Sequence, residues 1–194
     1  MNKVTQKDQW EFTWRDRNNR STRLLFELDR GYRYKVIAHS EEDKAKFLDL
    51  LLRPPETAIV SQDGGLLNNI SIDENLLLPV SYHGLLTEST GRHIVELFEL
   101  CGLSEIETQE FLTQLPIKLS TYQRRLAGFV RSALMNPRVM VYDSILEGVF
   151  KAEIEQVRRF DDFYRRYSPA HTAIYLDYDT HSNTHTNANQ TFIL

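Results

Sequence analysis

The sequence has little of what marks a secreted, membrane-spanning or nucleic-acid-binding protein. Its single cysteine, Cys101, excludes an intrachain disulfide framework and a cysteine-rich zinc site, and it suits a reducing compartment. No apolar run approaches the roughly 20 residues that span a bilayer, and the first residues have no apolar core of signal-peptide length. The 23 Lys and Arg against 27 Asp and Glu give a net charge of −4, so we expect no nucleic-acid partner.

Short β-rich runs alternate with helical patterns along the chain, and this alternation predicts an α/β sheet. The 194 residues suffice for a real core, and we expect a single domain over 1–194. The expected strands are 10–14, 22–28, 33–38, 57–60, 138–142, 172–176 and 191–194. The expected helices are 41–53, 91–101, 105–114, 121–135 and 151–166, and the strandless stretch of about 85–135 is expected to be an inserted helical lobe.

Four segments, in order, resemble the ATP-binding subunits of ABC transporters. They are similar to the strand entering the phosphate loop, the Q-loop with its following helix, the signature motif with its helix, and the Walker B strand. In this sequence they are 31–38, 59–63 with 71–76, 119–125 with 131–137, and 139–143. The resemblance spans 22–178 and implies a P-loop NTPase-like sheet of the ABC ATPase type. The interval from Lys44 to Gln62 is shorter than the family's by a few tens of residues, which implies a reduced antiparallel β subdomain.

The resemblance also locates a degenerate phosphate loop at 38–45, where only Lys44 matches the motif. The glycines and the magnesium-binding hydroxyl of the motif are replaced by Ala38, Glu41, Asp43 and Ala45. On their own, Ser40 and the acids after it predict an ordinary helix N-terminus. We therefore expect ATP and Mg²⁺ to bind weakly or not at all. We also expect Lys44 to be exposed and its removal to be nearly silent for stability.

The other catalytic positions agree with this interpretation. Ser144 stands where the family has the glutamate that orients the attacking water, and Tyr178 stands where it has the switch histidine. No catalytic residue is intact, and the nucleotide-binding remnants are Lys44, Gln62, Asp143 and Ser120. Two weaker alternatives are His181 as a compensating histidine, and Trp14 or Trp10 as an adenine-stacking aromatic in place of a buried edge-strand tryptophan.

The resemblance implies a pseudo-ATPase that is a structural or regulatory subunit of a membrane transport complex. It would dock on a membrane permease or a competent ABC ATPase subunit, as a homodimer or heterodimer, at the inner face of the cytoplasmic membrane. The residues implied in docking are Gln62, Asp73, Glu74 and Asn75. Segments 143–148 and 189–194 resemble the Mla-type phospholipid-transport and lipoprotein-release branch. Two alternatives remain: a functional but divergent ABC ATPase subunit, and an unrelated α/β protein-interaction module.

Two further groups of residues favour solvated surface over a binding site. A metal cluster of His171, His181 and His185 lacks suitable carboxylate or cysteine spacing, so the sequence predicts no metal site. A basic patch requires arginines without acidic residues among them. Here acids are interspersed with the arginines, and this pattern predicts a solvated, salt-paired surface. These arginines are Arg124, Arg125, Arg131, Arg158, Arg159, Arg165 and Arg166.

Overall fold

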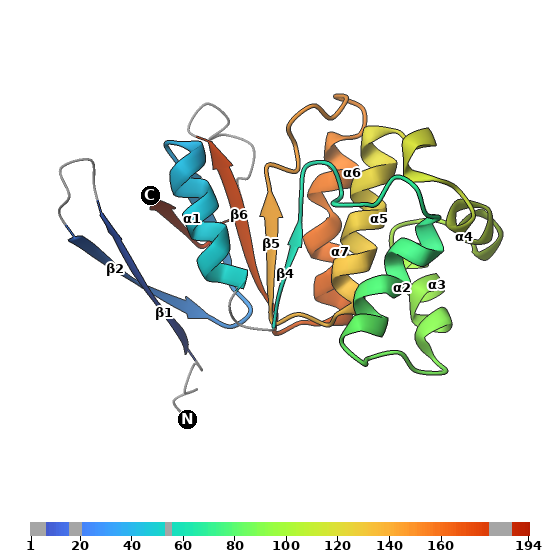
Figure 1. Ribbon diagram of the computed structural model, residues 1–194, viewed down its shortest axis with the longest axis horizontal. Helices are drawn as coiled ribbons and strands as arrows, with labels where there is room; N and C mark the ends of the chain where they lie inside the picture. Colours follow the sequence, from blue (N-terminus) through green and yellow to red (C-terminus); the bar gives the residue numbers. More distant parts are fainter. Residues whose placement is uncertain (1–6, 16–20, 53–55, 179–187) are drawn as a thin grey trace.

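The computed structural model describes residues 7–15, 21–52, 56–178 and 188–194. Its central element is a five-stranded parallel sheet in the order β4-β5-β6-β3-β7 (Figure 1). The strands are β3 (Arg33–Ala38), β4 (Thr57–Val60), β5 (Val139–Asp143), β6 (Thr172–Tyr178) and β7 (Gln190–Ile193). The antiparallel pair β1 (Lys7–Arg15) and β2 (Ser21–Asp29) forms a second, two-stranded sheet. The expected α/β fold is confirmed.

Helices cover both faces of the parallel sheet, which explains why its strands read as continuous apolar runs. Figure 1 shows α1 (Glu41–Leu52) separated by the strands from all the other helices. Phe47 and Leu51 of α1 join a buried cluster with Val36, Val141 and Leu176 of the sheet. This one helix therefore closes its face of the sheet over β3, β5 and β6.

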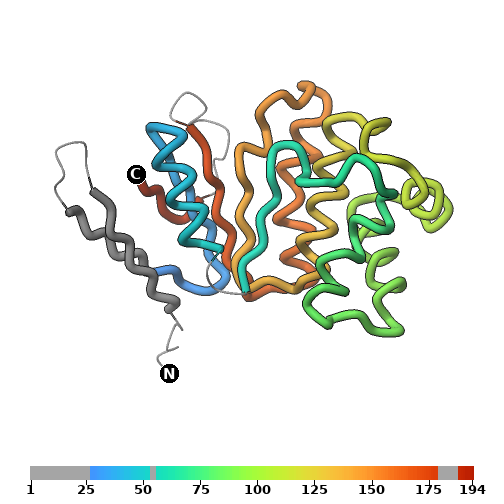
Figure 2. The backbone as a smooth tube through the Cα atoms, viewed as in Figure 1, coloured from blue at the N-terminus to red at the C-terminus, as the bar shows by residue number. Residues whose placement is uncertain are grey.

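The opposite face carries the larger core. Its helices are α2 (Ile72–Tyr82), α3 (Thr90–Leu100), α4 (Glu105–Leu112), α5 (Thr121–Leu134), α6 (Ile154–Arg158) and α7 (Phe160–Tyr167), with a 3₁₀ turn η1 (Pro116–Lys118). Phe129 of α5 stacks on Phe160 of α7 at a centroid distance of 4.7 Å. Both belong to the buried cluster that includes Met140 and Tyr142 of β5. The backbone trace in Figure 2 shows the loop after β4 crossing to the start of α2 on this side.

One sequence prediction about the helices is wrong. The expected helix 151–166 is two helices, because Arg159 ends α6 and begins α7, and neither proline nor glycine marks that break. The expected helical stretch of about 85–135 is preceded by α2, which is the helix that the resemblance implied after the Q-loop at 71–76. Helix α2 starts at the capping box of Ser71 and Glu74. It continues past Pro79, although proline usually ends or kinks a helix.

Candidate functional site

The junction between β3 and α1 is very short. β3 ends at Ala38 and α1 begins at Glu41, so only His39 and Ser40 lie between them. The N–H of Asp43 donates to Ser40 Oγ at 3.1 Å, and the Ser40 hydroxyl donates to Asp43 Oδ2 at 2.6 Å. The predicted N-cap is therefore confirmed. Two linking residues cannot make the long loop whose successive N–H groups surround a phosphate.

Lys44 lies in the first turn of α1 and points into the protein. Its residue exposure is 9%, and its Nζ lies 2.6 Å from Oδ1 of Asp143 at the end of β5. The same Nζ donates to Ser144 Oγ at 3.1 Å and lies 4.6 Å from the ring centroid of Tyr178. The expectation of an exposed Lys44 is wrong, because the shortness of the junction places this residue directly over the carboxyl ends of β5 and β6.

Neighbouring groups stabilise the protonated form of Lys44. Burial lowers the pKa of the ammonium, but the hydrogen bond and charge of Asp143 outweigh this effect, so that the pKa lies above its ordinary value. The face of the Tyr178 ring adds a favourable quadrupole. Burial, followed by a hydrogen bond to Glu41, raises the pKa of the Tyr178 hydroxyl. The lysine is therefore a cation at physiological pH.

Ser144 adopts a backbone conformation that is unusual for a serine. Its φ is +47°, in the left-handed region, and its N–H donates to the carbonyl oxygen of Leu176 at 2.9 Å. The strained backbone turns the hydroxyl toward Lys44 and starts the loop that follows β5. Lys44, Asp143, Ser144 and Tyr178 thus form one compact group, which we call the ion-pair site.

The ion-pair site does not fit a nucleotide and its magnesium ion as built. Lys44 is already occupied by a carboxylate, a hydroxyl and an aromatic ring. Ala45 offers a methyl group at the position of the metal-binding hydroxyl, and no carboxylate follows Asp143. In the part of the chain that the structure describes, no group of three His, Cys, Asp or Glu side chains could hold a metal ion.

The other two predicted nucleotide-binding remnants lie apart from this group. Gln62 is exposed, and its backbone oxygen accepts a hydrogen bond from Arg125 at 2.7 Å. Ser120 is the N-cap of α5, where its Oγ accepts from the N–H of Gln123 at 3.2 Å. No ion pair or hydrogen bond of the described residues joins either side chain to Lys44. Their roles here are those of a loop corner and a helix cap.

The residues predicted for docking differ in what they can contact. Asn75 is 1% exposed, and its side-chain amide exchanges hydrogen bonds with Leu67, at 2.7 Å and 3.0 Å, so it holds the loop before α2. Glu74 is exposed but serves the capping box with Ser71. Asp73 is half-buried, and its side chain takes no part in the capping box that Ser71 and Glu74 form. Gln62 and Asp73 are therefore the available side chains of the four.

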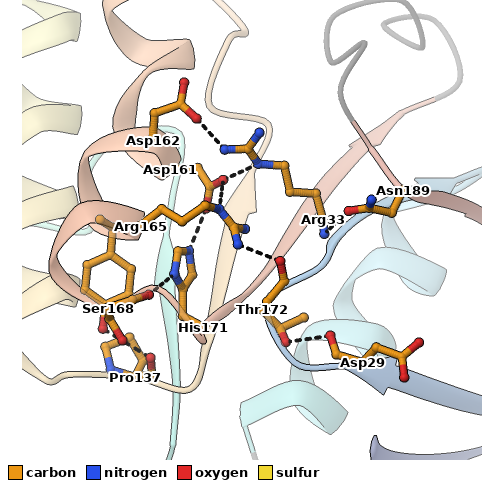
Figure 3. Close-up of polar contacts among 12 residues, drawn as sticks. Asp29, Arg33, Pro137, Asp161, Asp162, Arg165, Ser168, His171, Thr172 and Asn189 are labelled. Atoms are coloured by element: carbon orange, nitrogen blue, oxygen red, sulfur yellow. Dashed lines mark hydrogen bonds and ion pairs between the residues drawn. The ribbon is translucent and has the colours of Figure 1, made fainter. Parts of the chain in front are cut away.

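Sequence reasoning missed a buried ionic group at the opposite end of β6. Figure 3 shows Asp161 of α7 between Arg33, Arg165 and His171. His171 Nε2 lies 2.6 Å from Asp161 Oδ1, and its Nδ1 lies 2.7 Å from the carbonyl oxygen of Ser168. His171 is therefore a structural residue, whereas His181 and His185 lie outside the described residues. No spacing signal connects His171 with Asp161, since the contact depends on where α7 ends.

The predicted solvated, salt-paired arginine surface is wrong at Arg125 and Arg131, whereas Arg165 pairs with Asp161, one of the interspersed acids. Arg125 is 1% exposed and donates only to backbone carbonyls. Arg131 donates to the carbonyl oxygens of Gly64 and Gly65, and Arg165 joins the Asp161 group. The sequence does hold a signal for Arg125, because it lies four residues before Phe129 on the apolar face of α5. The tryptophan alternatives, Trp10 and Trp14, concern side chains outside the described part of the chain.

Comparison with known proteins places the fold. No protein-family model matches the chain. A methionine import ATP-binding protein, MetN of Geobacillus kaustophilus, is 29% identical over 108 residues, which cover 56% of this chain and 30% of that protein. A solved ATP-binding subunit of an ABC transporter superposes with a TM-score of 0.72 at 13% identity, over 96% of this chain and 85% of that one.

The chain thus has the fold of ABC ATP-binding subunits and spans about a third of the length of the curated relative that it matches. Both comparisons support the resemblance seen in the four sequence segments. Among the described residues, no helix has the length and apolar character needed to cross a membrane.

Proposed function

We propose that this chain is a catalytically degenerate ABC-type ATP-binding subunit, a pseudo-ATPase that serves as a structural or regulatory component of a membrane transport complex. The observation that carries the proposal is the 2.6 Å ion pair between Lys44 Nζ and Asp143 Oδ1. In a working phosphate loop the lysine faces phosphate oxygens, and the aspartate helps to hold Mg²⁺. Here each residue neutralises the other.

A nucleotide would have to displace this pair and then meet further repulsion. Glu41 and Glu42 are exposed carboxylates within the predicted phosphate loop 38–45, although the charge of Glu42 is partly offset by its ion pair with Lys46. A pair of like unit charges near 4 Å costs about 1 kcal/mol in water and about 4 kcal/mol at a surface-like dielectric of roughly 20. We therefore propose that neither ATP nor Mg²⁺ is a cofactor of this chain.

Calorimetry with Mg-ATP and a steady-state ATPase assay on the purified chain test this proposal. We expect neither binding at micromolar concentrations nor hydrolysis above the blank. The variant Ser144→Glu supplies the missing carboxylate but should stay inactive, since the water it would orient needs a bound, magnesium-bridged phosphate. A micromolar dissociation constant or steady turnover by the unaltered chain would instead establish the alternative of a divergent but functional ATPase.

The proposed partner is a membrane permease or a competent ABC ATPase subunit, bound at the inner face of the cytoplasmic membrane as part of a homodimer or heterodimer assembly. The supporting feature is segment 62–78, where Gln62, Leu67 and Leu78 are exposed and Asp73 is half-buried. From Gln62 to Glu88 the sequence holds four acids and no lysine or arginine. This segment therefore suits a partner that combines apolar and basic side chains.

Co-purification of the native protein without added nucleotide tests the docking proposal. We expect a permease or ATPase subunit of the ABC class to be recovered. Asp73→Lys should weaken its retention, whereas Glu105→Lys, the same charge change in the first turn of α4, should not. If neither kind of partner is recovered, or if both variants behave alike, the chain is better described as an interaction module of another kind.

The narrower form of the proposal is lipid-related transport. It is supported by the resemblance of 143–148 and 189–194 to the Mla-type branch. The methionine import named for the MetN relative belongs to that protein, of which this chain covers 30%. The alternative of an unrelated α/β module is less well supported, because the β3-to-α1 crossover is present and the superposition extends over 96% of the chain.

A further inference from the structure

Arg125 joins two loops that are far apart in the sequence. Its Nε donates to the carbonyl oxygen of Gln62 at 2.7 Å, and its two terminal nitrogens donate to the carbonyl oxygens of Ile145 and Glu147. The first acceptor follows β4 and the other two follow β5. The rigid planar guanidinium thus holds both loops at the carboxyl edge of the sheet from one point on α5.

The acceptors of Arg125 are all neutral. The residue is 1% exposed, and none of the ion pairs of the described residues includes it. Desolvation lowers the pKa of its guanidinium to about 10. A buried cation is costly, and this cost is offset by the three carbonyls together with the charges of Glu147, Asp63 and Glu153. The two loops therefore depend on each other.

Each loop contains hydrogen bonds between its own residues. In the first, Gly64 N–H donates to Ser61 at 3.0 Å, and Gly65 N–H donates to Asp63 Oδ1 at 2.8 Å. In the second, the N–H of Glu147 donates to the carbonyl oxygen of Ser144 at 3.1 Å. We therefore expect that a displacement at one end of either loop moves the carbonyl group of that loop that accepts a hydrogen bond from Arg125.

The second loop begins in the ion-pair site. Ser144 receives a hydrogen bond from Lys44 and accepts another from Glu147. Contiguous contacts therefore run from Lys44 through the second loop to Arg125, and from Arg125 to the exposed corner at Gln62. Such a path carries coupling only if the two ends share one conformational equilibrium, which a mutant cycle can measure.

We propose that Arg125 is a positioning residue that couples the loop 61–65 to the loop 144–147, so that the ion pair of Lys44 fixes the exposed Gln62 corner without any nucleotide. The inference rests on the proposed function only in taking that corner as part of the docking segment 62–78. If the chain were found to bind ATP, the proposed function would be overturned, but the coupling of the two loops would still be decided by the exchange measurements below.

Hydrogen–deuterium exchange of the full chain tests the coupling. Arg125→Lys keeps the charge but loses the three-way geometry, and it should speed exchange in both 61–66 and 144–149 by about tenfold. Arg124→Lys is the matched control, because it keeps the charge that Arg124 places near Asp63 and disturbs, among the hydrogen bonds of the described residues, a long one of 3.5 Å to Asn68, so it should change neither loop.

The decisive measurement is a cycle with Lys44→Met. Alone, this variant should speed exchange in both loops. In the Arg125→Lys background it should speed exchange in 144–149 only, which a merely structural role of Arg125 would not produce. The proposal is overturned if Lys44→Met leaves 61–66 unchanged, or changes it by the same factor in both backgrounds. If Arg125→Lys does not fold, the effect of Lys44→Met on 61–66 decides alone: faster exchange supports the coupling, and unchanged exchange overturns it.

Discussion

Gly128 in the middle of α5 lies directly against the backbone of Gly64. A Cβ atom on Gly128 would stand 2.5 Å from the carbonyl oxygen of Gly64 and 2.7 Å from its Cα. Gly64 itself has a φ of +79°, in the left-handed region that glycine adopts at little cost. The loop after β4 can therefore cross α5 this closely only because both residues at the crossing, Gly64 and Gly128, lack a side chain.

Gly128→Ala should destabilise the protein by about 2 kcal/mol, although alanine is favoured over glycine inside a helix by about 1 kcal/mol. The reason is that the added methyl group meets backbone, which cannot move aside as a side chain can. The free energy of unfolding in urea gives the value. Gly91→Ala in α3 is the control, since a Cβ there meets nothing within 4 Å, and it should be neutral or stabilising. Equal effects at the two positions would contradict the close crossing.

Lys44→Met should lower the free energy of unfolding by about 2 kcal/mol, because it leaves the Asp143 carboxylate, 15% exposed, without its cation. Lys46→Met removes a lysine from the same helix, but the ion pair of Lys46 with Glu42 is exposed and should contribute less than about 0.5 kcal/mol. The double variant Lys44→Met/Asp143→Asn should cost less than the sum of its two single variants. Strict additivity in urea unfolding would contradict the pair.

The ion pair between Lys44 and Asp143 could be predicted only in part from the sequence. Asp143 could be placed at the carboxyl end of a predicted parallel strand and Lys44 at the start of the helix that follows another, so their proximity follows from the pattern. Their direct pairing does not, because it depends on a two-residue junction that no periodicity reveals. The same holds for Arg125 and His171. Each is buried by contacts with segments distant in the sequence, and composition alone assigns such residues to the surface.

Acid should weaken the protein through Asp161. Burial alone would raise the pKa of this carboxyl, but the hydrogen bond and charge of His171, with the charges of Arg165 and Arg33, lower it to about 2. A pKa below the ordinary value near 4 means that the group stabilises the fold above about pH 4. This contribution, about 2 kcal/mol, is lost as the pH falls from about 4 to 2.

Urea unfolding at several values of pH between 7 and 2 measures this loss. Asp161→Asn should lower stability at pH 7 and flatten the dependence between pH 4 and 2. Asp162→Asn is the matched control, since Asp162 is exposed and pairs only with Arg33 among its recorded ion pairs. A pH dependence that is the same in Asp161→Asn as in the unaltered chain would show that another carboxyl is responsible.

Cys101 should react slowly with thiol reagents in the folded protein. Burial raises the pKa of its thiol to about 12, so little thiolate is present at pH 8. Labelling with a chromogenic disulfide should be slower than in urea-unfolded protein by roughly two orders of magnitude or more. Equal rates in the two states would mean that the end of α3 opens readily and exposes this residue.

The position of β3 in the sheet has a consequence for how the protein is made. β3 pairs with β6 and β7, and Arg33 is hydrogen-bonded to Asn189, 156 residues later in the chain. At a synthesis rate of about 5–20 residues per second, this early apolar strand waits on the order of ten seconds for its neighbours. During that time it offers an unpaired edge to other chains. Slow translation should therefore favour aggregation of the nascent protein, and a binding chaperone should increase its yield.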